Sequence, residues 1–173
     1  MRRTGFVPSV AGLEVRQVPA VSLNQMGAFL VIAADAAPQN HNVQVSMVGD
    51  KVDVQVDGSD NLFAAGSLAT VEFDAGATPA GTTQTFVNNT SLNAMAFGGA
   101  GENDFVAGHS WDFFVGGGGV NNFTANDGYV VFFGQGQSNN FTLGTGAGFV
   151  LGDSATTTVS LPPASANYWV VTW

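Results

Sequence analysis

The 173-residue sequence predicts an all-β fold, a right-handed parallel β-roll or β-solenoid with two nine-residue repeats per rung. Three features support this fold class: a nine-residue period after Gly98, glycine at the start of most repeats, and alternating apolar and polar residues upstream. Apolar residues make up 45% of the chain, which is enough for a packed core despite the 23 glycines. No stretch shows the period of an amphipathic helix.

Residues 1–26 are expected to form a basic tail or a targeting segment. Three of the four basic residues lie there, namely Arg2, Arg3 and Arg16. The apolar stretch 26–34 ends at Ala34, and the small residues Ala34 and Ala36 match the A-x-A pattern of a cleavage site. It therefore matches both the apolar part of a cleaved signal and a β-strand, and the sequence leaves both interpretations open.

Residues 27–97 are expected to form less regular solenoid rungs. Apolar residues alternate with polar ones in two segments, at Val43, Val45 and Met47 and again at Val52, Val54 and Val56. Alternation with a period of two is typical of strands that bury one face. Glycine and aspartate separate these segments, as expected for turns between strands.

Residues 98–160 divide into seven consecutive nonapeptides. Their eighth position is always apolar: Phe105, Phe114, Phe123, Phe132, Phe141, Val150 and Val159. Glycine is concentrated in the first four positions, where a tight turn is expected to need positive φ. Each nonapeptide is therefore predicted to be a turn followed by a short strand with its eighth residue in the core. Residues 161–173 are expected to add a C-terminal strand or cap.

The nonapeptide GGAGENDFV, residues 98–106, resembles the G-G-x-G-x-D-x-U-x unit of the RTX calcium-binding β-roll. The segment GLEVRQVPA, residues 12–20, is similar to a segment that precedes such repeats in secreted proteins of planctomycete bacteria. The resemblance implies an exported protein, extracellular or on the cell surface, with no assigned activity. It also implies that the sixth residue of each repeat binds calcium.

The sixth position departs from that pattern, because Asp112 alone has the expected carboxylate. Asn103, Asn121 and Asn139 occupy it in alternate repeats. Residues 18 positions apart should stack about 4.8 Å apart, and an amide column can hydrogen-bond along itself. This column predicts a roll that requires no cofactor. The alternative is a weakened Ca²⁺ site that uses Asp112, Asn103 and Asn121, since asparagine still offers an oxygen ligand.

The two predicted sheets differ in their outward residues. One sheet, with segments such as VNNFT and SNNFT, is polar outside, whereas the other, with WDFFV, YVVFF and AGFVL, is apolar on both faces. Its predicted partner-interface residues are Trp111, Phe113, Val115, Tyr129, Val131, Phe133, Phe149 and Leu151, with Met95 and Phe97 one rung earlier. A sheet that is apolar on both faces is normally covered. The cover is expected to be the N-terminal segment, the C-terminal NYWVVTW, or another molecule such as a second copy.

The composition limits the possible functions. A net charge of −9 disfavours nucleic acid as a partner, and no apolar run reaches the roughly 20 residues of a transmembrane helix. His41 and His109 lie outside any ligand-spaced motif, and no combination of residues suggests acid–base or nucleophilic catalysis.

We therefore expect a non-enzymatic, exported structural protein of the cell surface or matrix that acts through self-assembly or adhesion. One alternative is a calcium-binding RTX-like module. A second alternative is a carbohydrate-binding solenoid that contacts a surface glycan through Trp111 and Tyr129.

Overall fold

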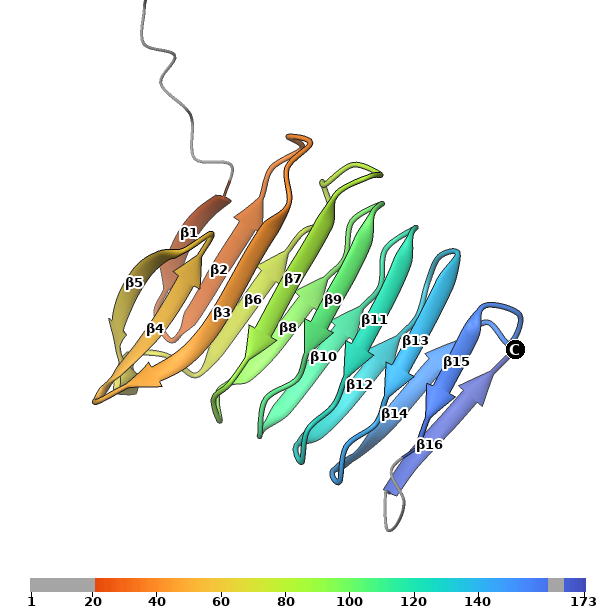
Figure 1. The fold of residues 1–173 in the computed structure, drawn as a ribbon. Helices are drawn as coiled ribbons and strands as arrows, with labels where there is room; N and C mark the ends of the chain where they lie inside the picture. Colours follow the sequence, from red (N-terminus) through yellow and green to blue (C-terminus); the bar gives the residue numbers. More distant parts are fainter. Residues whose placement is uncertain (1–20, 162–166) are drawn as a thin grey trace, which may run out of the picture.

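The computed structural model describes residues 21–161 and 167–173, and this part of the chain coils into a parallel β-solenoid with two sheets (Figure 1). Sheet A contains, in spatial order, β1 (Val21–Met26), β2 (Phe29–Ala34), β6 (Thr70–Asp74), β8 (Asn93–Phe97), β10 (Trp111–Val115), β12 (Tyr129–Phe133), β14 (Ala147–Gly152) and β16 (Asn167–Thr172). Sheet B contains β15 (Thr157–Ser160), β13 (Ser138–Thr142), β11 (Val120–Thr124), β9 (Glu102–Val106), β7 (Thr83–Asn88), β3 (His41–Val48), β4 (Lys51–Val56) and β5 (Ser59–Ala64). The predicted all-β solenoid fold is confirmed.

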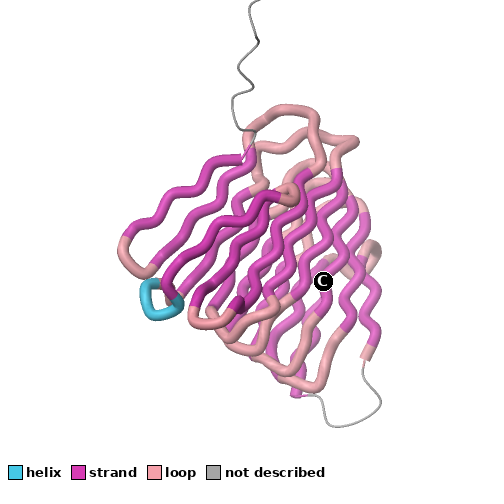
Figure 2. Tube along the Cα trace, turned by 60° about the vertical axis from the view of Figure 1, so that its left-hand side comes forward, coloured by secondary structure: helices cyan, strands magenta, loops and turns pink. Residues whose placement is uncertain are grey.

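Turns collect along the two edges where the chain passes from one sheet to the other (Figure 2). The helical turn η1 (Ala65–Ser67) follows β5 near the N-terminal end of the stack. Within the described ranges, no helix has the length and apolarity needed to cross a membrane.

The stacking register confirms two nonapeptides per rung. In sheet A, Trp111 lies beside Tyr129, which lies beside Ala147. In sheet B, Phe123 lies between Phe105 and Phe141. Neighbouring strands of this region are parallel, and each residue pairs with the residue 18 positions later.

The phenylalanines of the eighth position form the core between the sheets. Rings from the two sheets interdigitate, with centroids 5.2 Å apart for Phe123 and Phe132 and 5.6 Å apart for Phe105 and Phe114. The fully or almost fully buried members are Phe105, Phe114, Phe123, Phe132, Phe141 and Val150, while Val159 in the last coil is half-buried. Burial of each ring stabilises the fold by roughly 1.5–3 kcal/mol, so this column is the main source of core stability.

The N-terminal end departs from the expected parallel rungs. Residues 21–26, which the sequence analysis assigned to the tail, form strand β1, antiparallel to β2. Strands β3, β4 and β5 form an antiparallel meander rather than successive coils. The rest of the expected tail, residues 1–20, lies outside the described residues.

Buried residues of this region largely follow the predicted alternation. Val43, Val45, Val52 and Val54 are fully buried, and Val56 is 8% exposed. Met47 was predicted to share their face but is 48% exposed. It lies beyond Val45, the last residue of β3 that pairs with β7, so a neighbouring coil is missing on that side. Residues 29–34 are a core strand with Leu30 and Ile32 fully buried, which confirms the strand interpretation of that segment.

Most of the turn glycines are required by close packing around them rather than by positive φ. A Cβ atom on Gly117 would lie 1.7 Å from the carbonyl oxygen of Gly99 in the preceding turn. In the nonapeptide region, positive φ occurs at Gly136 and Gly148 and not at the other glycines. The prediction that these glycines are needed for positive φ is therefore wrong at most positions. At most of them a side chain is excluded because the backbone or a side chain of a neighbouring residue lies too close.

Candidate functional site

The asparagine column lies inside the solenoid beside the turns that lead into sheet B. Asn103, Asn121 and Asn139 are fully buried. The Asn103 Nδ2 donates to Asn121 Oδ1 over 2.9 Å, and Asn121 Nδ2 donates to Asn139 Oδ1 over 2.9 Å. The Asn103 and Asn121 oxygens also accept backbone N–H groups from Gly99 and Gly117, at 2.9 and 3.0 Å. These amides therefore hydrogen-bond along the stack and close the turns, as the sequence predicted.

The three predicted metal-ligating residues do not come together. Asn103 and Asn121 are neighbours in sheet B, whereas Asp112 lies on β10 in sheet A. Among the described residues, no group of three or more histidine, cysteine, aspartate or glutamate side chains is arranged to hold a metal ion. The two asparagine oxygens already accept hydrogen bonds inside the coil, so they offer little to a cation.

Asp112 is a fully buried carboxylate near the opposite row of turns. Its oxygens accept hydrogen bonds from Asn88 Nδ2 at 3.1 Å and from the Gly108 backbone N–H at 3.0 Å. Burial outweighs these bonds and raises the pKa of Asp112 to about 6. The Asn88 partner could not be predicted from the repeat, because its separation from Asp112 is not a multiple of nine residues.

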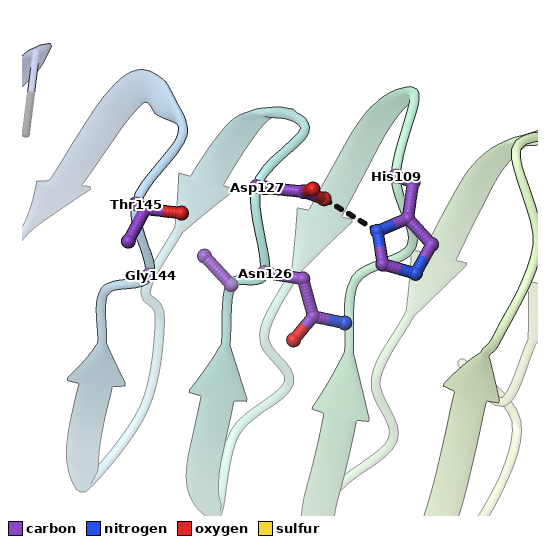
Figure 3. Close-up of a pocket in the computed structure, with 6 residues that line it drawn as sticks. His109, Asn126, Asp127, Gly144 and Thr145 are labelled. Carbon is purple, nitrogen blue, oxygen red and sulfur yellow. Dashed lines mark hydrogen bonds and ion pairs between the residues drawn. The ribbon is translucent and has the colours of Figure 1, made fainter.

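Three successive turns on this side form a shallow, open depression of about 360 Å³ (Figure 3). It is lined by His109, Ala125, Asn126, Asp127, Gly144 and Thr145. The His109 Nδ1 hydrogen-bonds the Asp127 carboxylate, which lowers the pKa of Asp127. Both side chains are at least half exposed. The depression does not enclose a ligand in the way that small-molecule sites do.

His109 was expected to lie outside any ligand-spaced motif, and Asp127 was overlooked. The two residues are 18 positions apart, so they stack in successive coils. The repeat period was therefore the signal that could have predicted the pair.

The outer face of sheet A is the most distinctive surface of the described chain. All eight predicted interface residues alternate with buried neighbours and point outward from β10, β12 and β14. We call this surface, from β8 to β16, the apolar outer face. Its residues are Met95, Phe97, Trp111, Phe113, Val115, Tyr129, Val131, Phe133, Phe149, Leu151, Trp169, Val171 and Trp173.

The rings of this face contact one another across strands. Trp111 stacks on Phe113 with ring centroids 6.1 Å apart, and Phe149 stacks on Trp169 at 6.5 Å. The exposed fractions are 38% for Trp111, 40% for Tyr129, 39% for Phe149 and 70% for Trp169. With Trp173 at 60%, these rings alone expose roughly 500 Å², taking about 200 Å² per aromatic side chain. The half-buried aliphatic residues enlarge a patch that already reaches the upper range for a monomer.

Polar residues bound the apolar outer face on one side. The outward residues of β6 are Thr70, Glu72 and Asp74, and Glu72 lies beside Met95. Partial burial and the neighbouring Asp74 carboxylate raise the pKa of Glu72.

The outside of sheet B is polar, as predicted. Asn122 Nδ2 donates to Asp104 Oδ1 over 2.7 Å, and Asn140 Nδ2 donates to Asn122 Oδ1 over 2.8 Å. This second, external amide ladder leaves sheet A as the sheet with the extended apolar surface.

The C-terminal segment does not cover the apolar outer face. Residues 167–172 form β16, which pairs in parallel with β14 and extends the face by one strand. That predicted mode of cover is wrong, because Trp169 and Val171 point outward in register with Phe149 and Leu151. The other intramolecular candidate, the N-terminal segment up to residue 20, lies outside the described residues. The described chain forms two layers, and none of its segments crosses the outside of sheet A (Figure 1).

Comparison with protein-family models, curated proteins and solved structures gives no significant match. The part of the RTX resemblance that the structure supports is the stacked-coil β-solenoid, which rests on strand pairing and register.

Proposed function

We propose that this protein is a non-enzymatic structural protein that acts by self-association through the apolar outer face of sheet A. The observation behind this proposal is the continuous surface of exposed and half-buried apolar side chains across five adjacent strands. Water contact along such a row costs about 25 cal/mol per Å², which association would relieve. The extracellular or cell-surface location is part of the proposal and rests on the resemblance to exported repeat proteins.

The interior chemistry is consistent with a structural role. The asparagine column and Asp112 direct their polar groups to partners within the coil, where they stabilise turns. Hydrogen bonds of this kind restrain the backbone and leave the outer faces to make external contacts.

Val131→Asp tests the proposal at the centre of the face. A charge buried in an interface without a partner is strongly unfavourable, so the assembly should dissociate while the monomer keeps its melting temperature. Multi-angle light scattering measures the mass, and thermal melts followed by circular dichroism measure stability. Thr142→Asp on the exposed outside of β13 is the matched control, and it should leave both mass and melting unchanged.

Two results would contradict self-association. A wild-type protein that stays monomeric at high micromolar concentration would overturn the proposal directly. A monomeric wild type whose Val131→Asp variant melts at a lower temperature would instead indicate that the chain covers its own face.

A glycan-binding role is the second candidate. Trp111 and Tyr129 are neighbours in register and present partly exposed rings at one edge of the face, where a sugar ring can stack. Retention of the wild type on polysaccharide, and loss of that retention in Trp111→Ala, would favour adhesion over self-association. Unchanged retention in that variant would exclude these rings as the binding site.

A further inference from the structure

The size of the apolar outer face fits a second copy of this chain. Its most exposed rings present roughly 500 Å² per molecule, and the half-buried valine, leucine, methionine and phenylalanine side chains add to this. A specific interface typically buries about 800 Å² on each partner. The area of the apolar outer face of one molecule therefore approaches the area that each partner buries in a stable dimer.

The shape of the face selects another sheet as its counterpart. Five parallel strands present three rows of side chains in register, with Phe113, Val131 and Phe149 in the middle row. Sheets of this kind pack face to face about 10 Å apart, with strand directions within about 30°. A second copy offers such a sheet with the same apolar chemistry.

Two twofold arrangements bring these faces together. An axis perpendicular to the strands places each strand opposite its own copy and reverses the strand direction. An axis parallel to the strands keeps the strand direction and reverses the order of the strands about the axis. Charge and side-chain size distinguish the two arrangements.

The acidic strand β6 disfavours the order-retaining arrangement. That arrangement places Glu72 opposite Glu72 of the second copy, with Asp74 one row away opposite Thr70, at the border of an apolar interface. Like charges facing each other at low dielectric are unfavourable, and the pKa of Glu72 is already raised by partial burial and by Asp74. Reversal of the order about β12 places β8 opposite β16 of the partner, so that β6 projects beyond the partner's last strand.

Side-chain size and polarity also favour reversed order. In that arrangement Trp111 faces Ala147, and Val131 faces its own copy on the axis. Asn93 then faces Asn167, so polar residues meet at the edge of the interface. In the order-retaining arrangement Asn93 faces Phe97 instead, which leaves an amide against a ring.

We propose that two copies of this chain pack sheet A against sheet A, related by a twofold axis that runs along β12 parallel to the strands. This inference rests on the proposed function and specifies its geometry. It predicts an isologous, closed pair and not an open polymer through this face.

Cross-linking of single-cysteine variants tests the geometry, because the natural chain contains no cysteine. Val131→Cys should cross-link to its own copy with a bis-maleimide whose spacer is about 10 Å, since facing sheets lie about that far apart. Met95→Cys should not cross-link to itself. Its strand lies two strand spacings from the axis, so its two copies are displaced laterally by roughly 19 Å. Met95→Cys mixed with Trp169→Cys should give the cross-linked heterodimer. Light scattering must show that each variant remains dimeric.

The outcomes separate this inference from the proposed function. A dimer in which Met95→Cys cross-links to itself would overturn the reversed-order geometry and leave self-association intact. A dimer that Val131→Cys fails to cross-link would place the interface elsewhere and overturn both the geometry and the assigned face. A wild type that is monomeric by light scattering would overturn the proposed function itself.

Discussion

At the scale of single residues, Asp112 links burial to the pH dependence of stability. Its carboxylate accepts two hydrogen bonds but is fully removed from water, and its pKa rises from 3.8 to about 6. The folded chain therefore binds a proton more tightly than the unfolded chain. Between about pH 4 and pH 6 the free energy of unfolding should decrease as the pH rises, and above pH 7 the full cost is roughly 3 kcal/mol.

Asp112→Asn should remove this dependence. The amide resembles the protonated carboxyl, so the variant should be more stable than the wild type by only about 1 kcal/mol at pH 4.5, and by up to roughly 3 kcal/mol at pH 7.5. Urea unfolding of both proteins at the two pH values measures the difference. A difference of equal size at both pH values would show that Asp112 ionises normally in the folded state.

At the scale of elements, the turn between β10 and β11 shows how close stacking restricts the sequence. Gly117 faces the backbone of the preceding turn, whereas a Cβ on its neighbour Gly118 would meet no atom within 4 Å. Gly117→Ala should therefore lower the free energy of unfolding by about 2–4 kcal/mol, because either the stacked backbones or the hydrogen bonds between them must shift. Gly118→Ala is the matched control and should change it by less than about 0.5 kcal/mol. Equal losses in chemical denaturation would indicate that the turns stack less closely than described.

The elements that the sequence predicted well are those with the repeat period. The 18-residue spacing determined, for each strand, its neighbouring strands, its direction and the face on which each side chain lies. The amide column of sheet B and the apolar outer face of sheet A could therefore be located. Alternation from Val43 to Val56 predicted strands and buried valines, but a period of two does not specify the neighbouring strand. The antiparallel meander was therefore missed.

A C-terminal strand was expected, but its place in sheet A beside β14 was missed, for a different reason. Trp169 pairs with Phe149 across 20 residues instead of 18, so the period fails at this step. The alternation of NYWVVTW still places Tyr168 and Val170 inward and Trp169 and Val171 outward. The close contact between turns could not be predicted either. A glycine in a sequence does not show whether it is needed for a positive φ angle or because a Cβ atom would clash with a neighbouring turn.

At the scale of the whole molecule, the two sheets share one core but differ in their outward chemistry. The internal amide column replaces the carboxylates that would require cations between them. We therefore expect the chain to show the same far-ultraviolet circular dichroism and melting temperature with excess chelator as with millimolar Ca²⁺. A chain that is unfolded in chelator and folds on calcium addition would support the calcium-binding alternative, because ion binding would then supply its folding free energy.

The fixed 18-residue step also determines which changes of chain length this architecture tolerates. Removal of one full coil, such as residues 116–133, would connect β10 to the turn that leads into β13. Strand β13 would then take the place of β11, and every later strand would stay in its present sheet. Removal of nine residues, such as 116–124, would instead transfer all later strands to the opposite sheet. The external amide of Asn140 on β13 would then be on the side of Trp111, and the Phe149 ring of β14 would be on the side of Asp104. Insertions and deletions in this region should therefore be tolerated in whole coils, which makes the coil the modular unit by which such a chain lengthens or shortens.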